Sequence, residues 1–275
     1  MALIINTNVS SLFAQQYLAQ NQTNLSNTLQ RLSSGKRINN ASDDPAGLAI
    51  ASTMLANVNG LNVGSRNGQD GVNLVATAAG AMQVILNDLQ TMNQLAVQAA
   101  NGTNGSQDRA NLDAQYQALL SEIGRITTQT NFNNVSILGG GSISIQIGSG
   151  NTSNDQITVN LTNTSTGSAG LNIAGTDLTS ATNASTAIGS LNLAIAALTT
   201  GLATIGADSA NLQAAIQSNN AYATNLTAAQ SAIMDADYAA ESANMAKFTI
   251  LSQSDVAMLS QANSAPSLVL QLLRQ

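Results

Sequence analysis

Residues 188–233 read IGSLNLAIAALTTGLATIGADSANLQAAIQSNNAYATNLTAAQSAI. Apolar residues recur along this stretch at alternating steps of three and four, which is the spacing of a helix face that packs along a seam. Because no proline interrupts it, the stretch predicts one helix of about 50 residues, roughly 75 Å long at 1.5 Å per residue. Eleven of the fourteen positions on this stripe are apolar, and the stripe runs through Ile188, Leu191, Ile195, Leu198, Leu202, Ile205, Ser209, Leu212, Ile216, Asn219, Ala223, Leu226, Gln230 and Ile233.

Three further stripes predict helices elsewhere in the chain. At the N-terminus, Leu18, Leu25 and Leu32 recur every seven residues, with Leu29 between them. A second stripe is apolar at every step and comprises Val75, Ala78, Met82, Ile85, Leu89, Met92, Ala96 and Ala99. The C-terminal stripe is broken by Asp255 alone and comprises Phe248, Leu251, Asp255, Met258, Ala262, Ala265, Val269 and Leu272. Because the two terminal stripes are unpaired and similar in length, we expect them to pair in an antiparallel bundle.

The middle of the chain has a different pattern. Isoleucines alternate with polar residues over 143–147, and apolar residues alternate again over 157–161, after a polar loop. This alternation predicts a β-hairpin. Residues 148–187 are rich in Ser, Thr, Asn and Gly and predict an exposed, lightly structured insert. The predicted fold is therefore mainly α: a long antiparallel helical bundle or coiled coil with paired N- and C-termini, a short β-hairpin and a small polar central insert.

Composition excludes most enzyme classes. The 275 residues include no His, no Cys and no Trp, so the chain has no imidazole base, no thiol nucleophile and no ligand set for an ordinary zinc site. Asp235, Asp237 and Glu241 lie close together in the sequence, but no base or nucleophile accompanies them, which favours a capping or intersubunit role. We therefore expect no catalytic residue, no metal and no cofactor.

The net charge of −6 comes from 14 acidic and 8 basic residues, and aromatic residues make up 3% of the chain. Nucleic-acid binding is therefore not expected. Uninterrupted apolar runs are only a few residues long, so we expect no membrane insertion, and the N-terminus lacks the basic and apolar regions of a cleaved signal peptide. The terminal helices carry Ala, Ser, Asn and Gln where a solvated coiled coil carries Glu and Lys, which indicates that this face meets other protein.

Several segments resemble bacterial flagellin. They are Ile5-Asn-Thr-Asn-Val9, the twenty residues LSSGKRINNASDDPAGLAIA at 32–51, LAVQAANGT at 95–103, TNFN at 130–133 and SAIMDAD at 231–237. The resemblance covers roughly residues 1–147 and 184–275. It implies a subunit of the flagellar filament that is exported unfolded through the flagellar type III apparatus without a cleaved signal peptide. It also implies that the termini of free subunits order on assembly.

The resemblance implies a division of the chain into three parts. Residues 1–42 and 236–275 form an inner coiled coil that lines a channel, residues 43–147 and 184–235 form an outer helical domain, and residues 148–183 form a variable surface insert. The implied partners are other copies of the chain, filament cap and hook-junction proteins, an export chaperone with the export apparatus, and sister flagellins. The Ser/Thr-rich insert is either a plain solvated loop or a carrier of O-linked glycans.

Three groups of residues are candidates for these roles. Assembly along the terminal seam is assigned to Leu18, Leu25, Leu29, Leu32, Phe248, Leu251, Met258, Val269 and Leu272. A spoke between the inner and outer domains is assigned to Lys36, Arg37, Asp43 and Asp44. The resemblance also implies an epitope for the animal innate-immune flagellin receptor, at Gln90, Thr91, Asn93, Gln94, Leu95 and Gln115. Many flagellins carry Arg and Glu in this epitope, so their absence here predicts weak recognition.

Other readings remain. A hook–filament junction protein belongs to the same structural class, but it would lack the strong match over residues 32–51. Flagellins with a zinc-protease insert carry His-Glu-x-x-His, and the absence of His excludes them here. A glycan-binding coat protein would have to use the polar insert, which offers no aromatic platform.

Overall fold

The computed structural model describes the backbone of residues 7–272 and the side chains of residues 7–264. The chain forms two compact units. Among the described residues, unit 1 contains 7–56 and 225–272, and unit 2 contains 57–224. Helices α2, Pro45–Ala100, and α4, Ala181–Met234, each contribute to both units.

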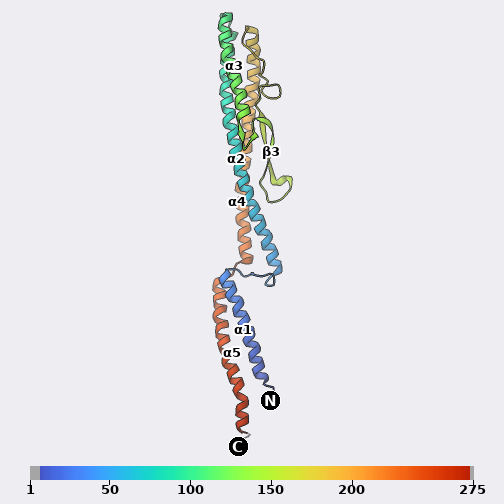
Figure 1. Cartoon of the computed structure of the whole chain (residues 1–275), viewed down its shortest axis with the longest axis vertical. Helices are drawn as coiled ribbons and strands as arrows, with labels where there is room; N and C mark the ends of the chain where they lie inside the picture. Colours follow the sequence, from blue (N-terminus) through green and yellow to red (C-terminus); the bar gives the residue numbers. More distant parts are fainter. Residues whose placement is uncertain (1–6, 273–275) are drawn as a thin grey trace. The chain divides into compact units, whose positions relative to one another are not determined.

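Unit 1 is built on α1, Val9–Ser34, and α5, Tyr238–Leu272, which lie side by side and antiparallel (Figure 1). The side chain of Asn8 caps the start of α1 by accepting a hydrogen bond from the Ser11 amide. The helix ends at Gly35, whose φ of 70° is the left-handed conformation that glycine adopts without strain. The carboxylate of Asp237 accepts from the first amides of α5. The predicted pairing of the two chain ends is confirmed.

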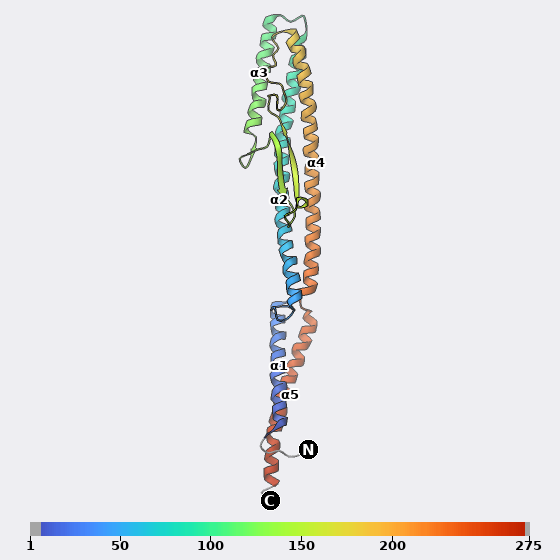
Figure 2. The ribbon, with the colours of Figure 1, turned by 90° about the vertical axis from the view of Figure 1, so that its right-hand side faces the viewer.

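In unit 2, α3, Ser106–Gln129, packs with α2 and α4 as a helical bundle (Figure 2). The predicted stripe of α2 is confirmed at every position, because all eight of its side chains are at most 2% exposed. Side chains that are buried all along one helix face provide most of the free energy that holds such a bundle together. The long helix predicted from residues 188–233 is also confirmed and begins seven residues earlier, at Ala181.

The buried line along α4 differs from the predicted stripe by one residue at alternate positions. Leu191, Leu198, Ile205 and Leu212 are buried as predicted, but Ala187, Ala194, Gly201 and Asp208 replace Ile188, Ile195, Leu202 and Ser209 at its centre. The physical reason is close approach. A Cβ placed on Gly201 would overlap the hydroxyl of Thr162, and the larger side chains of Ile188, Ile195 and Leu202 flank this line and are partly buried.

Two antiparallel hairpins connect α3 to α4. In the first, β1, Asn131–Phe132, pairs with β2, Val135–Ser136, through Asn133 and Asn134, which both have positive φ. In the second, β3, Gly139–Gln146, pairs with β4, Gln156–Asn163, and places Ile143 opposite Val159. The loop between β3 and β4 contains the short 3-10 helix η1, Ser153–Asp155. The second hairpin is the one predicted from alternation.

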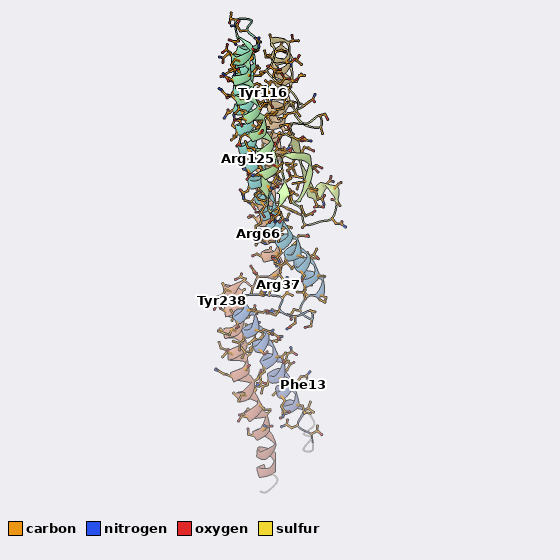
Figure 3. The ribbon with its side chains drawn as sticks, turned by 45° about the horizontal axis from the view of Figure 1, so that its top comes forward. Phe13, Arg37, Arg66, Tyr116, Arg125 and Tyr238 are labelled. Atoms are coloured by element: carbon orange, nitrogen blue, oxygen red, sulfur yellow. The ribbon has the colours of Figure 1, made fainter. Side chains whose placement is uncertain are left out.

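The expectation of an exposed insert is correct for residues 149–154 and wrong farther along the chain. Leu171, Ile173 and Leu178 are at most 4% exposed and belong to the core of unit 2. Tyr116 lies on α3 (Figure 3). Its hydroxyl lies 2.5 Å from that of Thr176 and fixes this segment to α3. The segment is polar in composition, yet its three large apolar side chains, Leu171, Ile173 and Leu178, are spaced so that each one reaches the core.

Helices α2 and α4 have a property that the search for uninterrupted apolar runs did not reveal. In the described part of the chain, each contains an 18-residue window, with mean hydropathy of 1.2 and 1.6 respectively, that is long and apolar enough to cross a membrane. A core helix passes the same test of length and composition. In this chain, the buried faces of both helices pack against each other and against the hairpin in unit 2.

Candidate assembly surface

Polar side chains make the specific links between α1 and α5. Three links cross the contact at successive positions along α1. The Ser11 hydroxyl donates to Asn263 at 2.8 Å, and the Asn21 amide donates to the Asp255 carboxylate at 2.6 Å. Farther along, Arg31 lies 3.6 Å from the buried carboxylate of Glu241. Partly buried polar pairs of this kind favour one register of the two helices.

Very little of this contact is apolar and buried. The buried side chains of α1 are Ser11 and Thr28, and among the described side chains of α5 only Glu241 is buried. The predicted seam residues Leu18, Leu25, Leu32, Phe248 and Leu251 are half-buried. A helix pair with so few buried apolar groups gains little from the hydrophobic effect in a single chain.

Large apolar side chains instead lie on the outer faces of this pair. Their exposed fractions range from 47% to 67%, and they occur on both helices. Val9, Leu12, Phe13 and Tyr17 follow helical spacing along one face of α1, and an exposed apolar stripe of this kind marks a site of protein association. We name this set the outer apolar face; it comprises Val9, Leu12, Phe13, Tyr17 and Leu29 on α1, and Tyr238, Ile250, Val256 and Met258 on α5.

Two predicted seam residues belong to this outer face. Leu29 is 48% exposed and Met258 is 62% exposed, whereas their neighbours Thr28 and Leu259 point into the α1–α5 contact. The side chains of Val269 and Leu272 lie outside the described residues. The inward stripe of α1 also keeps steps of three and four, and it runs through Ser11, Ala14, Leu18, Asn21, Leu25, Thr28 and Leu32. A search for apolar spacing missed Ser11, Asn21 and Thr28 because they are polar.

The four spoke candidates lie near the connection between α1 and α2. Lys36 pairs with Asp235 in an isolated β-bridge. The Arg37 amide donates to the carbonyl of Met234 at 2.7 Å, and its guanidinium donates to that of Ile233. These contacts join the α1–α2 connection to the α4–α5 connection within unit 1.

The two aspartates of this segment organise its turns. Asp43 accepts from the amides of Asn40 and Asn39, and these hydrogen bonds lower the pKa of its carboxyl. Asp44 caps the start of α2 by accepting from Gly47, and it also lies 3.8 Å from Arg37. Capping a turn and bridging two connections are structural roles.

The six candidate epitope residues lie on α2 and α3 of unit 2. Gln90, Thr91, Gln94 and Gln115 are exposed. Asn93 is partly buried and donates to Asn192 of α4 at 3.1 Å, and Leu95 packs against the core. The exposed members present amides and a hydroxyl instead of the charged groups expected from the family pattern.

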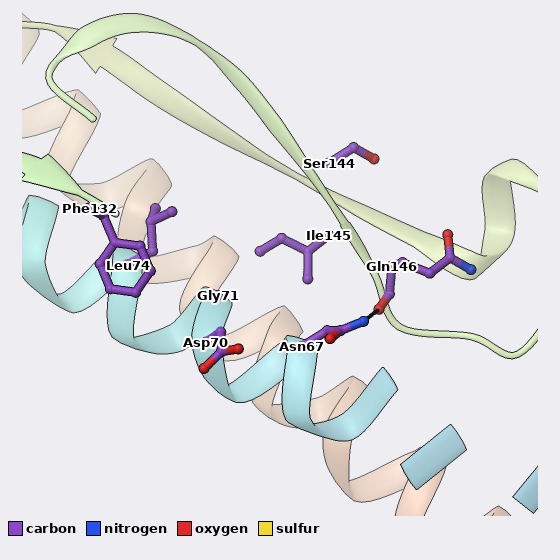
Figure 4. A pocket seen from close by; sticks show the side chains of 8 residues that line it. All are labelled: Asn67, Asp70, Gly71, Leu74, Phe132, Ser144, Ile145 and Gln146. Carbon is purple, nitrogen blue, oxygen red and sulfur yellow. Dashed lines mark hydrogen bonds between the residues drawn. The ribbon is translucent and has the colours of Figure 1, made fainter. Parts of the chain in front are cut away.

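A hollow of about 260 Å³ lies where the end of β3 crosses α2 (Figure 4). Asn67 donates from its amide to the carbonyl of Gln146 at 3.0 Å, and Ile145 lies above Gly71. The lining contains one carboxylate, Asp70, and one hydroxyl, that of Ser144, which donates to the side chain of Gln156 at 2.7 Å. Among the described residues, no group of three or more acidic side chains is placed to hold a metal ion.

Known proteins are similar to this chain over nearly its whole length. Residues 5–142 match the bacterial flagellin N-terminal helical region, and residues 188–273 match the bacterial flagellin C-terminal helical region. The flagellin of Halalkalibacterium halodurans is 39% identical over 99% of this chain and 100% of its own. That of Listeria monocytogenes is 35% identical over 98% and 99%.

The crystal structure of Bacillus cereus flagellin is 35% identical and matches 60% of this chain and 94% of its own, with a TM-score of 0.50. The N- and C-terminal family regions that match here include both α1 and α5. All of α2 and α3 and residues 188–234 of α4 are matched as well. This chain belongs to the bacterial flagellin family, and it is a structural subunit of the extracellular flagellar filament.

Proposed function

We propose that copies of this chain polymerise through the outer apolar face of α1 and α5. The observation that carries the proposal is a contrast within the α1–α5 pair: nine large apolar side chains of these two helices are exposed, whereas their contact buries Ser11, Thr28 and Glu241. Fully burying one such apolar side chain is worth about 1.5–3 kcal/mol. Neighbouring copies that cover this face would therefore supply the free energy that a single pair lacks.

The proposal also assigns a role to each of the three parts of the chain. Residues 1–42 and 236–275 would form the inner, channel-lining coiled coil, and residues 43–147 and 184–235 the outer helical domain. Residues 148–183 would form the variable surface insert, in which every residue of the loop 149–154 is exposed. Lys36, Arg37, Asp43 and Asp44 would form the spoke between the domains. The support is that Lys36 and Arg37 bond to the α4–α5 connection and that Asp44 lies 3.8 Å from Arg37.

Seeded elongation tests the proposal. Purified chain is depolymerised, added to filament fragments and followed by electron microscopy. Full-length chain should elongate the seeds, and chain lacking residues 240–275 should not. Ile250→Asp introduces a charge at a position that is 65% exposed, so it should block elongation without changing the helix content of the monomer.

The matched control is Val135→Asp, an exposed apolar position in the β1–β2 hairpin of unit 2. This variant should elongate seeds like the parent chain. Equal elongation by the Ile250→Asp chain would contradict the proposed surface. Full-length chain that stops after one ring would instead favour the hook–filament junction reading.

The family also supplies proposals for partners and export. Cap and hook-junction proteins would contact the ends of the polymer, and an export chaperone with the type III apparatus would handle the unfolded chain before assembly. Sister flagellins would join the same filament. Mass spectrometry of secreted filaments tests the export route, because a chain exported without a cleaved signal retains its first residues.

We also propose that the innate-immune flagellin receptor recognises this chain weakly. The support is that Gln90, Thr91 and Gln94 are exposed and uncharged. An amide cannot replace the bidentate, charge-assisted contacts of an arginine. In a receptor reporter assay, the combined Thr91→Arg, Asn93→Arg and Gln94→Glu substitutions should raise potency, and full potency of the parent chain would contradict the proposal.

A further inference from the structure

The chain contains four Asn-Gly dipeptides, at 59–60, 67–68, 101–102 and 104–105. An asparagine followed by glycine is prone to deamidation, in which the glycine nitrogen attacks the asparagine side chain. Glycine permits this attack because it has no Cβ to keep its amide nitrogen away from the preceding side chain. Asparagine is for this reason a thermolabile residue. The structure holds these four dipeptides in three different backbone environments.

Two of the dipeptides lie inside α2. Asn59-Gly60 and Asn67-Gly68 are both far from the helix ends, where each backbone N–H is committed to an i→i−4 hydrogen bond. The side chain of Asn67 is also held by its hydrogen bond to Gln146. Attack by either glycine nitrogen requires the helix to open first.

The dipeptide Asn104-Gly105 lies outside a helix but is held at both reacting groups. The Gly105 amide donates to the carboxylate of Asp108 at 3.0 Å, and the Asn104 side-chain amide donates to the carbonyl of Gln98 at 2.6 Å. Both contacts must break before the Gly105 nitrogen can reach the Asn104 side chain.

Asn101-Gly102 is free of these constraints. The dipeptide follows the last residue of α2, both residues are exposed, and the Gly102 amide makes no hydrogen bond within the described part of the chain. The space around Gly102 is open. In addition, the Thr103 amide donates to the Asn101 side-chain oxygen at 3.2 Å. Negative charge develops on this oxygen during attack, so the donor favours the reaction.

We propose that Asn101 is a site of spontaneous deamidation in the folded subunit. The Gly102 nitrogen forms a bond to the side-chain carbonyl carbon of Asn101, and its proton and the side-chain amino group leave as ammonia. Water then opens the resulting succinimide, which yields aspartate or isoaspartate. Each event makes the net charge of −6 more negative by one unit. The new carboxylate lies beside the carbonyl end of α2, where the helix dipole disfavours negative charge.

Peptide mapping by mass spectrometry tests the proposal. Full-length folded chain is incubated at neutral to mildly alkaline pH, and amide loss is followed at all four asparagines, with isoaspartate detected by enzymatic methylation. Asn101 should convert first, while Asn59, Asn67 and Asn104 remain amides. In chain unfolded with urea, the four rates should become similar, because the differences arise from the fold.

Two variants separate the proposed cause from the local sequence. Gly102→Ala adds a Cβ into open space at a residue with negative φ, so the variant should fold normally. Conversion of Asn101 should slow about tenfold, which corresponds to ~1.4 kcal/mol of barrier. Asp108→Ala releases the Gly105 amide and should accelerate conversion at Asn104. An unchanged Asn101 in the folded chain, or equal rates at all four sites, would overturn the proposal.

Discussion

Gly64 of α2 lies so close to the carbonyl oxygen of Ile147 that a Cβ on Gly64 would overlap it. The same carbonyl accepts a hydrogen bond of 2.9 Å from the side-chain amide of Asn219 on α4. Asn67, one turn along α2, donates to the carbonyl of the preceding residue, Gln146. The end of β3 is therefore held between α2 and α4 at a site that only glycine on α2 permits.

The first prediction concerns this contact. Gly64→Ala should destabilise unit 2 by about 1–3 kcal/mol, because the added methyl group forces backbone atoms apart. The control is Gly80→Ala, also within α2, where nothing lies within 4 Å of the added Cβ. The control should be stabilised by about 0.5–1 kcal/mol through the better helix propensity of alanine. Thermal unfolding of the soluble monomer followed by circular dichroism checks both, and equal effects would contradict this account.

The second prediction concerns Asp88 of α2. Burial raises the pKa of its carboxyl above the ordinary value of 3.8, and the nearby negative charge of Glu122 raises it further. One of its oxygens is buried without a hydrogen-bond partner. The folded chain therefore binds this proton more tightly than the unfolded chain, so the contribution of Asp88 to stability falls as pH rises from 3.8 through the raised folded value.

Asp88→Asn removes this ionisation. The melting temperature of the variant should exceed that of the parent at pH 7, and the difference should shrink as the pH approaches 3.8. A hydrogen bond from Arg125 lowers the pKa of the Glu122 carboxyl, so the contribution of Glu122 to stability is lost as the pH falls. Both chains contain Glu122, and the informative quantity is therefore the difference between their melting temperatures. Asp70→Asn, at an exposed carboxylate of the same helix, is the control. A difference that is independent of pH would contradict the assignment.

The third prediction concerns the hydrogen bond between Asn21 and Asp255. Hydrogen bonds to charged groups contribute about 1.5–3 kcal/mol, and removal of one partner leaves the other partly buried without its contact. Asn21→Ala and Asp255→Ala should each raise the critical concentration for seeded elongation about tenfold, which corresponds to ~1.4 kcal/mol. The double variant should be no worse than either single variant, because both remove the same link. Additive losses would show that the two residues act separately.

The fourth prediction concerns the link between Tyr116 and Thr176. Tyr116→Phe keeps the buried ring and removes the hydroxyl, so it should destabilise unit 2 by about 0.5–1.5 kcal/mol. Leu89→Ala, which leaves a cavity at a fully buried position, should cost about 2–5 kcal/mol in the same measurement. A loss from Tyr116→Phe as large as that from Leu89→Ala would show that the loop 164–180 depends on more than this contact.

The helices and the β3–β4 hairpin could be predicted from spacing, because apolar period and burial coincide along α2. They coincide less well where helices approach closely. On α4 the buried line includes Ala187, Ala194 and Gly201, and a Cβ on Gly201 would overlap Thr162. This line therefore lies beside the larger residues that a hydrophobicity pattern selects. Small residues carry little apolar signal, although they determine how near two helices can come.

The α1–α5 contact was predicted as a pairing but not residue by residue. Its inward line includes Ser11, Asn21 and Thr28, and an apolar count therefore selected Leu29, which points outward. In most proteins the large apolar side chains are buried and the polar ones are exposed. In the α1–α5 pair of a single chain this relation is reversed, because large apolar side chains are exposed where neighbouring copies would contact them. The buried Leu171 and Ile173 were missed for a different reason, since isolated apolar residues in a polar loop have no period.

Amide hydrogen exchange, compared between monomer and filament, tests the central claim most directly. If neighbours cover the outer apolar face, amides of residues 9–34 and 238–264 should exchange quickly in the monomer and be strongly protected in the filament. Amides of residues 75–99, whose inward side chains are already buried in the single chain, should change little. Equal protection of the two terminal segments before and after assembly would contradict the claim that α1 and α5 form the assembly surface.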